Sequence, residues 1–380
     1  MKKHFLLDPE ITFLNHGSFG ACPKPVFDVY QNWQLELERQ PVEFLGRRAI
    51  PLLAESREKL AEYLNCAARD VVYFPNPTTA INMVVRSLDL QPGDEILTTD
   101  HEYGAMDRTW QYYCAKSGAK YIQRHVPLPV TSHADFVEHF WAGVTPKTKV
   151  IFFSHITSTT ALIFPATEIC KRAREAGILC IVDGAHAPAH IQLDLSALDA
   201  DIYTGALHKW LLAPKGAAFL YARRDIQDQL DPLVVSWGYD SEPGYGSGNP
   251  FLDYHEWQGT RDIAAFLSVP AAIDFQREQD WDYVRARCRG LVRATQQKVS
   301  ALTGIPPICA HPEEWLGQLV ALPLPSGVDG AALKDRLYDD YRIEIPFTQF
   351  EDQSFLRLSV QAYNTEEELD YFVKTLADLL

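Results

Sequence analysis

The sequence predicts an α/β fold with a large domain built on a mostly parallel sheet and a smaller α+β domain towards the C-terminus. Between about residues 70 and 225, short runs of β-branched and aromatic residues alternate with helical patterns, as in parallel strands joined by helical crossovers. The 380 residues exceed what one typical core supports. After residue 262 the order changes to a long helical stretch followed by mixed strands and helices, which indicates a second domain.

The first part of the chain contains seven candidate strands. Several are apolar throughout, as expected for strands buried on both faces. In such a sheet, functional loops follow the carboxyl ends of the strands. The expected strands are Val71–Phe74, Glu95–Thr99, Lys120–His125, Lys149–Ser154, Leu179–Asp183, Ile202–Thr204 and Ala217–Ala222.

A segment rich in glycine and turn residues, 237–250, separates the two parts and predicts a long loop. The expected large domain covers residues 16–262, and the small domain combines residues 1–15 with 263–380. Beyond the loop we expect helical structure over 262–303, a strand Gln318–Leu322, a helix 329–340, strands Arg342–Ile345 and Phe355–Ser359, and a helix from near Thr365.

Charge and cysteine content narrow the class of protein. A net charge of −15 without a basic run argues against nucleic acid and favours a small-molecule partner. The seven cysteines form no C-x-x-C pair, so we expect a reduced, cytoplasmic protein. The first apolar run is too short for a signal peptide, and no run approaches the roughly 20 residues of a membrane span.

Lys209 is the first residue with a chemical implication. It follows an apolar strand and is flanked by His208 and Trp210. Burial there would lower the pKa of its amine and leave it free to attack an aldehyde. The alternative is a surface lysine whose alkyl stem lies along apolar side chains.

Asp183 ends the apolar strand before the one that leads to Lys209. A carboxylate at this edge of a sheet lies where ligands bind, and it could keep a pyridine nitrogen protonated. A helix cap or a metal ligand would also explain it.

Residues 74–82 read as a strand end, a turn and a helix start, with Asn76, Thr78 and Thr79 in the turn. A helix N-terminus that carries hydroxyl groups suits a phosphate. Ordinary helix capping explains the same residues.

Together with residues 15–20 (Asn-His-Gly-Ser-Phe-Gly), these motifs resemble class V of the fold type I pyridoxal phosphate enzymes. More narrowly, the chain resembles the isopenicillin N epimerase-like branch, which is related to cysteine desulfurases and cysteine or cystine C–S lyases. The resemblance covers nearly the whole chain. It implies pyridoxal 5'-phosphate as cofactor, an amino acid as substrate, and a homodimer.

The resemblance also implies roles for individual residues. Lys209 would form the Schiff base and move the Cα proton, while Asp183 would pair with the pyridine nitrogen. Tyr103 would stack on the cofactor ring, a role that suits a flat aromatic face, and count among the catalytic residues. The further cofactor contacts implied are His186, Asn76, Thr78, Thr79, Ser158, His208 and, from the partner subunit of a dimer, the pair Gly259 and Thr260.

Arg357 matches the family arginine that binds the substrate α-carboxylate, for which a bidentate guanidinium is well suited. A surface ion pair would be the alternative. Asn15, His16 and Ser18 are expected to contribute to the substrate site, although a glycine-rich turn needs no such role.

Three features depart from the desulfurase pattern. The span 343–350 lacks the nucleophilic cysteine, so persulfide transfer by that route is not expected. Ser158 replaces a ring-facing asparagine, and Pro77 has no N–H for a phosphate. The sequence contains neither a complete H-E-x-x-H zinc motif nor a nucleotide-binding glycine motif.

Several reactions at the amino-acid Cα or Cβ remain open. After an external aldimine forms and loses its Cα proton, reprotonation on the opposite face gives epimerisation, for which Tyr103, His16 and Lys215 are candidate second acids. Loss of sulfur from Cβ gives a C–S lyase, and reprotonation at the cofactor gives an aminotransferase. A cofactor-binding module without turnover is a further alternative, against which the presence of both Lys209 and Arg357 argues.

Overall fold

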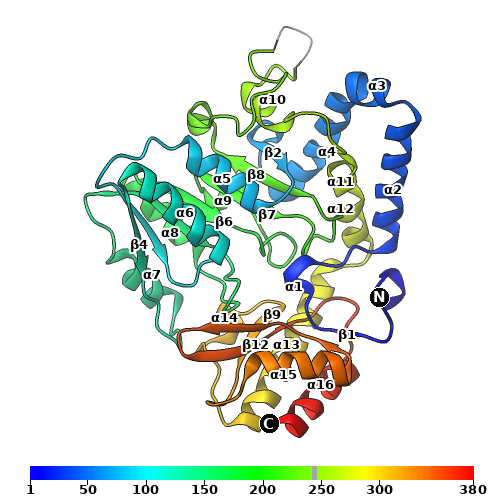
Figure 1. Ribbon diagram of the computed structural model, residues 1–380, viewed down its shortest axis with the longest axis vertical. Coiled ribbons are helices and arrows are strands. Elements are labelled where there is room, and N and C mark those ends of the chain that lie inside the picture. Colours follow the sequence, from blue (N-terminus) through cyan, green and yellow to red (C-terminus); the bar gives the residue numbers. More distant parts are fainter. Residues whose placement is uncertain (242–245) are drawn as a thin grey trace.

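The computed structural model describes residues 1–241 and 246–380. Its centre is a seven-stranded sheet with the order β2-β8-β7-β6-β5-β3-β4 (Figure 1). All seven expected strands are present, with ends that differ by two residues at most. They are β2 (Val71–Phe74), β3 (Glu95–Thr99), β4 (Lys120–Arg124), β5 (Thr148–Ser154), β6 (Leu179–Asp183), β7 (Ile202–Ala206) and β8 (Ala218–Ala222).

The sheet is mostly parallel, as predicted. Strands β4, β3, β5, β6 and β7 run parallel to one another, and β8 is antiparallel to both β7 and β2. Because β7 and β8 are paired and consecutive, the connection between them, residues 207–217, turns back at the carboxyl end of β7. This connection carries Lys209 to the edge of the sheet where ligands bind in such folds.

Alternating residues of the strands supply two separate hydrophobic clusters, as the two-residue period of a strand requires. Val72, Phe152 and Ile181 pack with helices α5 (Pro77–Ser87) and α6 (Gly104–Ser117) on one face. Their chain neighbours Tyr73, Phe153 and Val182 belong to the other cluster, which continues into the C-terminal part of the chain. The sheet is therefore covered on both faces.

A second, three-stranded antiparallel sheet has the order β11-β12-β9 (Phe347–Phe350, Gln353–Ser359, Leu319–Pro323). Helices α13, α15 and α16 pack beside it at the lower end of the molecule (Figure 1). The N-terminal strand β1 (Thr12–Phe13) pairs with β10 (Ile343–Glu344). This pairing joins the start of the chain to its C-terminal part, as the expected small domain requires.

Two elements differ from the prediction. The helical stretch 262–303 consists of three helices: α12 begins at Val269 with Pro270 in its first turn, and Asp280, with φ of 48°, caps the start of α13. The strand expected over Arg342–Ile345 is shorter, because Arg342 adopts a left-handed conformation, with φ of 57°, that ends α15.

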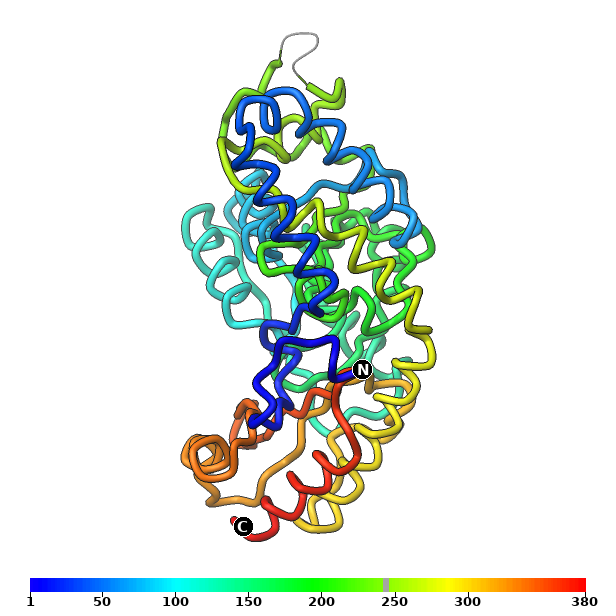
Figure 2. The backbone as a smooth tube through the Cα atoms, turned by 90° about the vertical axis from the view of Figure 1, so that its right-hand side faces the viewer, coloured from blue at the N-terminus to red at the C-terminus, as the bar shows by residue number. Residues whose placement is uncertain are grey.

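Helices α11 and α12 contact α2 and α4, whereas α13 contacts β9. In Figure 2, α2 runs along the upper part of the molecule, and the orange and red C-terminal segments lie together at the lower end. The division of the domains at residue 262 stays a prediction. Of the expected loop 237–250, residues 242–245 lie outside the described residues, and Pro250 already begins α10.

The remaining α-helices cover the two sheets or connect their strands. In the described ranges, no helix is both long and apolar enough to cross a membrane. The α-helices not yet delimited are α1 (His16–Phe19), α2 (Lys24–Arg39), α3 (Pro41–Glu43), α4 (Ala49–Leu64), α7 (His133–Trp141), α8 (Ala166–Glu175), α9 (Leu195–Leu198), α10 (Pro250–Glu256), α11 (Ala264–Leu267), α12 (Val269–Glu278), α13 (Trp281–Thr303), α14 (Pro312–Trp315), α15 (Gly330–Tyr341) and α16 (Glu366–Leu379).

Candidate active site

A pocket of about 430 Å³ lies where the carboxyl ends of the large sheet meet the C-terminal part of the chain. The strand ends contribute Ser154 and Asp183, and the β7–β8 connection contributes Lys209. Arg357 enters from β12 of the small sheet. The pocket therefore brings together the lysine, the carboxylate and the arginine that the sequence singles out.

Lys209 is part-buried, and its Nζ lies 3.1 Å from Nε2 of His186. Burial, reinforced by the positive charge of Arg357, lowers the pKa of Lys209 to about 7. A substantial fraction of the amine is then neutral near pH 7 and can act as a nucleophile. The backbone of Lys209 lies close to Gly20, where φ is 69° and a Cβ atom would come within 2.0 Å of the carbonyl oxygen of His208.

Asp183 ends β6 and is 4% exposed. Its Oδ1 accepts a hydrogen bond of 2.9 Å from the backbone N–H of Ala185. Burial raises the pKa of Asp183, so the carboxylate gains from a positively charged partner in the pocket. The next residue, Gly184, has no room for a side chain, because a Cβ atom there would lie about 2.1 Å from the hydroxyl oxygen of Tyr203.

The N-terminus of α5 forms another wall of the pocket through Asn76, Pro77 and Thr78. Asn76 caps the helix, and its Oδ1 accepts hydrogen bonds from the backbone N–H of Thr79 (2.8 Å) and from the hydroxyl of Thr79 (3.0 Å). The first turn of this 11-residue helix thus presents its positive end to the pocket. Thr79 itself is not among the lining residues.

Tyr103, His186, His208 and Ser158 also line the pocket. Tyr103 occupies the position before α6 without a capping hydrogen bond and is 48% exposed, so its ring is available to a ligand. Nδ1 of His208 lies 3.0 Å from the carbonyl of Ala217 and donates to it, so Nε2 of the neutral ring is left as a hydrogen-bond acceptor. Burial lowers the pKa of His208 to about 4.

Arg357 is a buried cation without a carboxylate partner among the described residues. One terminal nitrogen, Nη1, donates to the carbonyl (2.7 Å) and hydroxyl (3.1 Å) oxygens of Ser158, and Nη2 donates to Oγ of Ser18 (2.9 Å). Its Nε has no partner in the described part of the chain. An uncompensated buried charge is costly, so an anionic ligand fits here.

Of the other residues expected near the substrate, one lines the pocket and two lie behind its wall. Ser18 lines the pocket, but Asn15 and His16 do not. Asn15 donates to Glu344 (2.8 Å) and accepts from Ser18 (2.6 Å). His16 is fully buried behind Lys209, with Nε2 3.1 Å from the lysine carbonyl oxygen. Both are placed to support the pocket wall, because the turn that carries them packs against the site from behind.

Gly259 and Thr260 do not line the pocket of this chain. Thr260 is exposed, and Gly259 has φ of 108°, a conformation that favours glycine. Their expected contact is with the site of a partner subunit, so it stays a prediction.

Sequence reasoning missed several pocket residues. Ser154 ends β5, where the edge rule for parallel sheets could have pointed to it. Its hydroxyl donates to Oε2 of Glu102 (2.6 Å), a buried carboxyl group. Phe19, 74% exposed, and Phe347 line the mouth of the pocket without any motif that would have identified them.

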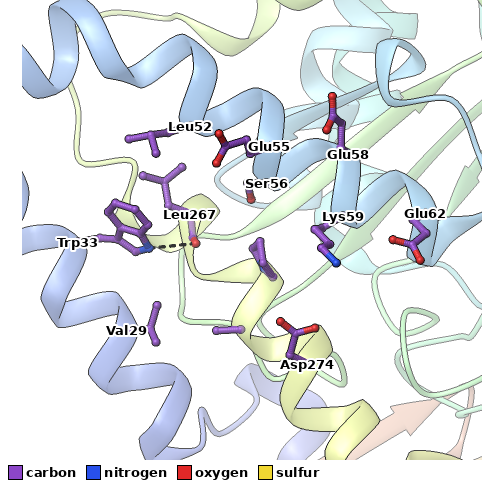
Figure 3. Close-up of a pocket in the computed structure, with 12 residues that line it drawn as sticks. Val29, Trp33, Leu52, Glu55, Ser56, Glu58, Lys59, Glu62, Leu267 and Asp274 are labelled. Atoms are coloured by element: carbon purple, nitrogen blue, oxygen red, sulfur yellow. Dashed lines mark hydrogen bonds between the residues drawn. The ribbon is translucent and has the colours of Figure 1, made fainter.

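A larger cavity of about 630 Å³ lies between α2, α4 and α12 (Figure 3). Trp33 lies at its edge, where its indole N–H donates to the carbonyl of Leu267 (3.1 Å). Four carboxylates and one lysine line it, and none of the residues expected to bind cofactor or substrate does. The smaller pocket around Lys209 is therefore the candidate active site.

The fold and this site define a class of protein, and comparison with known proteins agrees. Residues 21–372 match the family model described as aminotransferase class-V, so the chain belongs to this family. It is 40% identical to an isopenicillin N epimerase of Amycolatopsis lactamdurans, covering 98% of this chain and 96% of the relative. It is 29% identical to a probable chloroplastic L-cysteine desulfhydrase of Arabidopsis thaliana, covering 95% and 81%.

Solved structures share the fold. An apo cysteine desulfurase from Thermococcus onnurineus NA1 aligns with a TM-score of 0.86 at 21% identity, covering 100% of this chain and 96% of that one. A cystine C–S lyase in complex with its product cysteine persulfide aligns with a TM-score of 0.82 at 23% identity, covering 97% and 98%. The fold is thus that of the fold type I pyridoxal phosphate enzymes.

The protein is a pyridoxal phosphate-dependent enzyme, and the pocket fits this cofactor. The N-terminus of α5 offers an anion site. Asp183 offers a buried carboxylate that favours a cationic partner, and Lys209 offers an amine of lowered pKa. When bound, the cofactor supplies an aldehyde for the amine and an electron sink for a carbanion at the substrate Cα.

Proposed function

We propose that this enzyme epimerises the α-carbon of an amino acid or amino-acid derivative, with isopenicillin N as the first candidate substrate. One observation carries the proposal: Arg357, a buried cation without a carboxylate partner among the described residues, shares a pocket with the low-pKa amine of Lys209. Such a pair can hold an α-carboxylate and remove the neighbouring Cα proton.

The residues divide the work between binding and proton transfer. Arg357 fixes the carboxylate, with Ser158 and Ser18 holding the guanidinium in place. Lys209 takes the Cα proton, since its pKa of about 7 suits a general base at neutral pH. Asp183 keeps the cofactor ring nitrogen protonated. Asn76 and Thr78, which line the pocket, hold the phosphate, with His208 beside it.

Epimerisation needs a second acid that returns the proton from the opposite side. Of the three candidates, only Tyr103 lines the pocket. His16 is enclosed behind Lys209, and Lys215 donates to the carbonyl of Gly20 (3.0 Å). We therefore assign Tyr103 this role, in addition to contact with the cofactor ring.

A C–S lyase acting on a cysteine derivative is the second candidate. It is favoured by the names of the 29% identical cysteine desulfhydrase and of the cystine C–S lyase with the same fold. No cysteine lines the pocket in the described part of the chain, which argues against persulfide transfer. An aminotransferase ranks behind both, and a module without turnover ranks last.

We also propose that the enzyme is a cytoplasmic homodimer. In such a dimer, Gly259 and Thr260 of each subunit would reach the phosphate of the partner's cofactor. The exposure of Thr260 supports this arrangement.

Two assays test the proposal. Protein loaded with pyridoxal phosphate should have a visible absorbance band that borohydride bleaches and that Lys209→Ala lacks.

In heavy water, isopenicillin N should exchange its Cα proton and change configuration, and Tyr103→Phe should keep the exchange but lose the change of configuration. Pyruvate release from cysteine, cystine or S-substituted cysteines, without exchange of isopenicillin N, would favour the lyase. A colourless protein whose absorbance does not change on addition of pyridoxal phosphate would overturn the proposal.

A further inference from the structure

Behind the pocket, Lys209 contacts a cluster of buried rings that consists of His16, His186, His190 and Trp210. All four are at most 2% exposed. The ring centroid of Trp210 lies 4.1 Å from that of His190 and 5.0 Å from that of His16. Rings packed so closely have little freedom to rotate, so their hydrogen bonds are set by the fold.

The proton of His186 can be located from its partners. Nε1 of Trp210 lies 3.2 Å from Nδ1 of His186. An indole N–H can only donate, so Nδ1 of His186 must accept. Burial and the charges of Lys209 and Arg357 lower the pKa of His186 far below its usual value. The ring is therefore neutral, and its single proton is on Nε2.

The neighbouring histidines are fixed in the same way. The backbone N–H of Gln318 donates to Nε2 of His190 (2.6 Å), so Nδ1 of His190 carries the proton and donates to the carbonyl of His186 (3.0 Å). The carbonyl of Lys209 can only accept, so Nε2 of His16 is the donor to it (3.1 Å). His186 and His190 thus each have one tautomer that satisfies their partners, whereas Nε2 of His16 also lies 3.3 Å from the amide nitrogen of Gln361, which finds no acceptor there.

We propose that Trp210 is a positioning residue whose indole N–H holds the proton of His186 on Nε2, so that an N–H donor always faces Nζ of Lys209. With Nε2 of His186 donating at 3.1 Å, Nζ must accept with the lone pair of a neutral amine. The lysine is thereby kept ready to attack an aldehyde. This proposal rests on the proposed function only for the identity of the aldehyde that the amine attacks and of the proton that it later moves.

The opposite tautomer would have the opposite effect. A lone pair on Nε2 of His186 would accept a hydrogen bond from the ammonium form of Lys209, stabilise that charged form and so raise the pKa of Lys209. The other ionisable groups around Lys209 stay unchanged if only Trp210 is altered. They are Arg357, Asp183, His16, His208 and Lys215.

The tautomer can be measured directly in the cofactor-free protein. In a sample labelled with ¹⁵N-histidine, two-bond ¹H–¹⁵N correlations distinguish the two neutral forms, and loss of one pattern in His186→Gln assigns the residue. We expect His186 to be protonated on Nε2, without titration near neutral pH. Protonation on Nδ1, or a charged ring at neutral pH, would overturn the proposal, whatever reaction the enzyme catalyses.

A variant pair measures the consequence. The rate at which cofactor-free protein combines with pyridoxal phosphate should rise with pH around a midpoint set by Lys209, and Trp210→Phe should move this midpoint up by about one pH unit. Trp110→Phe is the matched control, because Nε1 of this buried tryptophan has no partner in the described residues. It should leave the midpoint unchanged.

The role of His186 is separated by a double substitution. In a His186→Gln background the side-chain amide donates without a choice of tautomer, so Trp210→Phe should shift the midpoint much less there. An unchanged midpoint in Trp210→Phe alone, or an equal shift in both backgrounds, would contradict the proposal. If Trp210→Phe does not fold, the tautomer of His186 measured in the unmodified protein still tests the proposal.

Discussion

Glu102 is a fully enclosed carboxyl group beside the active site. Its oxygens accept hydrogen bonds of 2.6 Å from the hydroxyls of Thr99 and Ser154. Burial nevertheless raises the pKa of Glu102 to about 8, with a smaller contribution from the charge of Asp183. Glu102 is thus mainly protonated at pH 7. A neutral Glu102 leaves Asp183 as the negative charge of this part of the pocket.

This pKa predicts how stability depends on pH. A carboxyl group whose pKa rises from 4.5 to about 8 on folding favours the folded state below pH 4.5 and loses that contribution as the pH rises through about 8. Glu102→Gln keeps the shape without the titration. The melting temperature of the variant relative to the unmodified protein should therefore rise between about pH 5 and about pH 8 and level off above that. A pH-independent difference would contradict this assignment.

The guanidinium group of Arg357 is expected to bind the substrate carboxylate through two hydrogen bonds. Arg357→Lys keeps the positive charge but loses the two-pronged geometry for a carboxylate. We expect KM to rise about 10–100-fold, corresponding to the loss of a charged hydrogen bond, while the cofactor absorbance persists. Arg172→Lys is the control, because Arg172 forms surface ion pairs with Glu138 and Glu168. An unchanged KM in Arg357→Lys would rule out the carboxylate contact.

At the scale of elements, α5 links stability to cofactor binding. Asn76→Ala removes the cap of this helix and should lower the free energy of unfolding by about 1 kcal/mol. It should also weaken binding of pyridoxal phosphate, measured by titration of the cofactor-free protein. Ser132→Ala removes the equivalent cap of α7, which is not at the pocket, and should cost similar stability without changing cofactor affinity. Equal affinity losses in both variants would refute a phosphate site at α5.

Most strands of the large sheet could be predicted because burial on both faces makes them continuous apolar runs between turns, although the edge strand β4 is only partly buried. The ends of the C-terminal helices and strands could not be predicted in this way. The break before α13 depends on Asp280 in a left-handed conformation, and aspartate there is only weakly distinctive in sequence. The end of α15 at Arg342 likewise has no glycine to mark it.

At the scale of the whole molecule, the site depends on contacts between distant segments. Asp183 ends β6 and Lys209 follows the neighbouring strand β7, so their meeting follows from the sheet. That Arg357 lacks an acid partner and that His16 faces away from the pocket follow from how the small sheet and the N-terminal turn pack, which no local pattern encodes. Of the residues that the resemblance assigned to the substrate, Arg357 and Ser18 line the pocket, whereas Asn15 and His16 lie behind its wall.

A dimer with shared sites makes a prediction about mixed subunits. Lys209→Ala destroys a subunit's own site, whereas Thr260→Asp would repel the phosphate in the partner's site; Thr260 is exposed, so this change should not disturb folding. Each variant alone should be nearly inactive. After the two are mixed and allowed to exchange subunits, half of the dimers combine both variants and contain one intact site, so activity should recover to about a quarter of the unmodified level. Mixing Lys209→Ala with Asp183→Ala, both within one subunit's own site, is the control and should restore nothing. Full activity of Thr260→Asp by itself, or no recovery in the mixture although mass measurements detect the mixed dimers, would show that the sites are not shared.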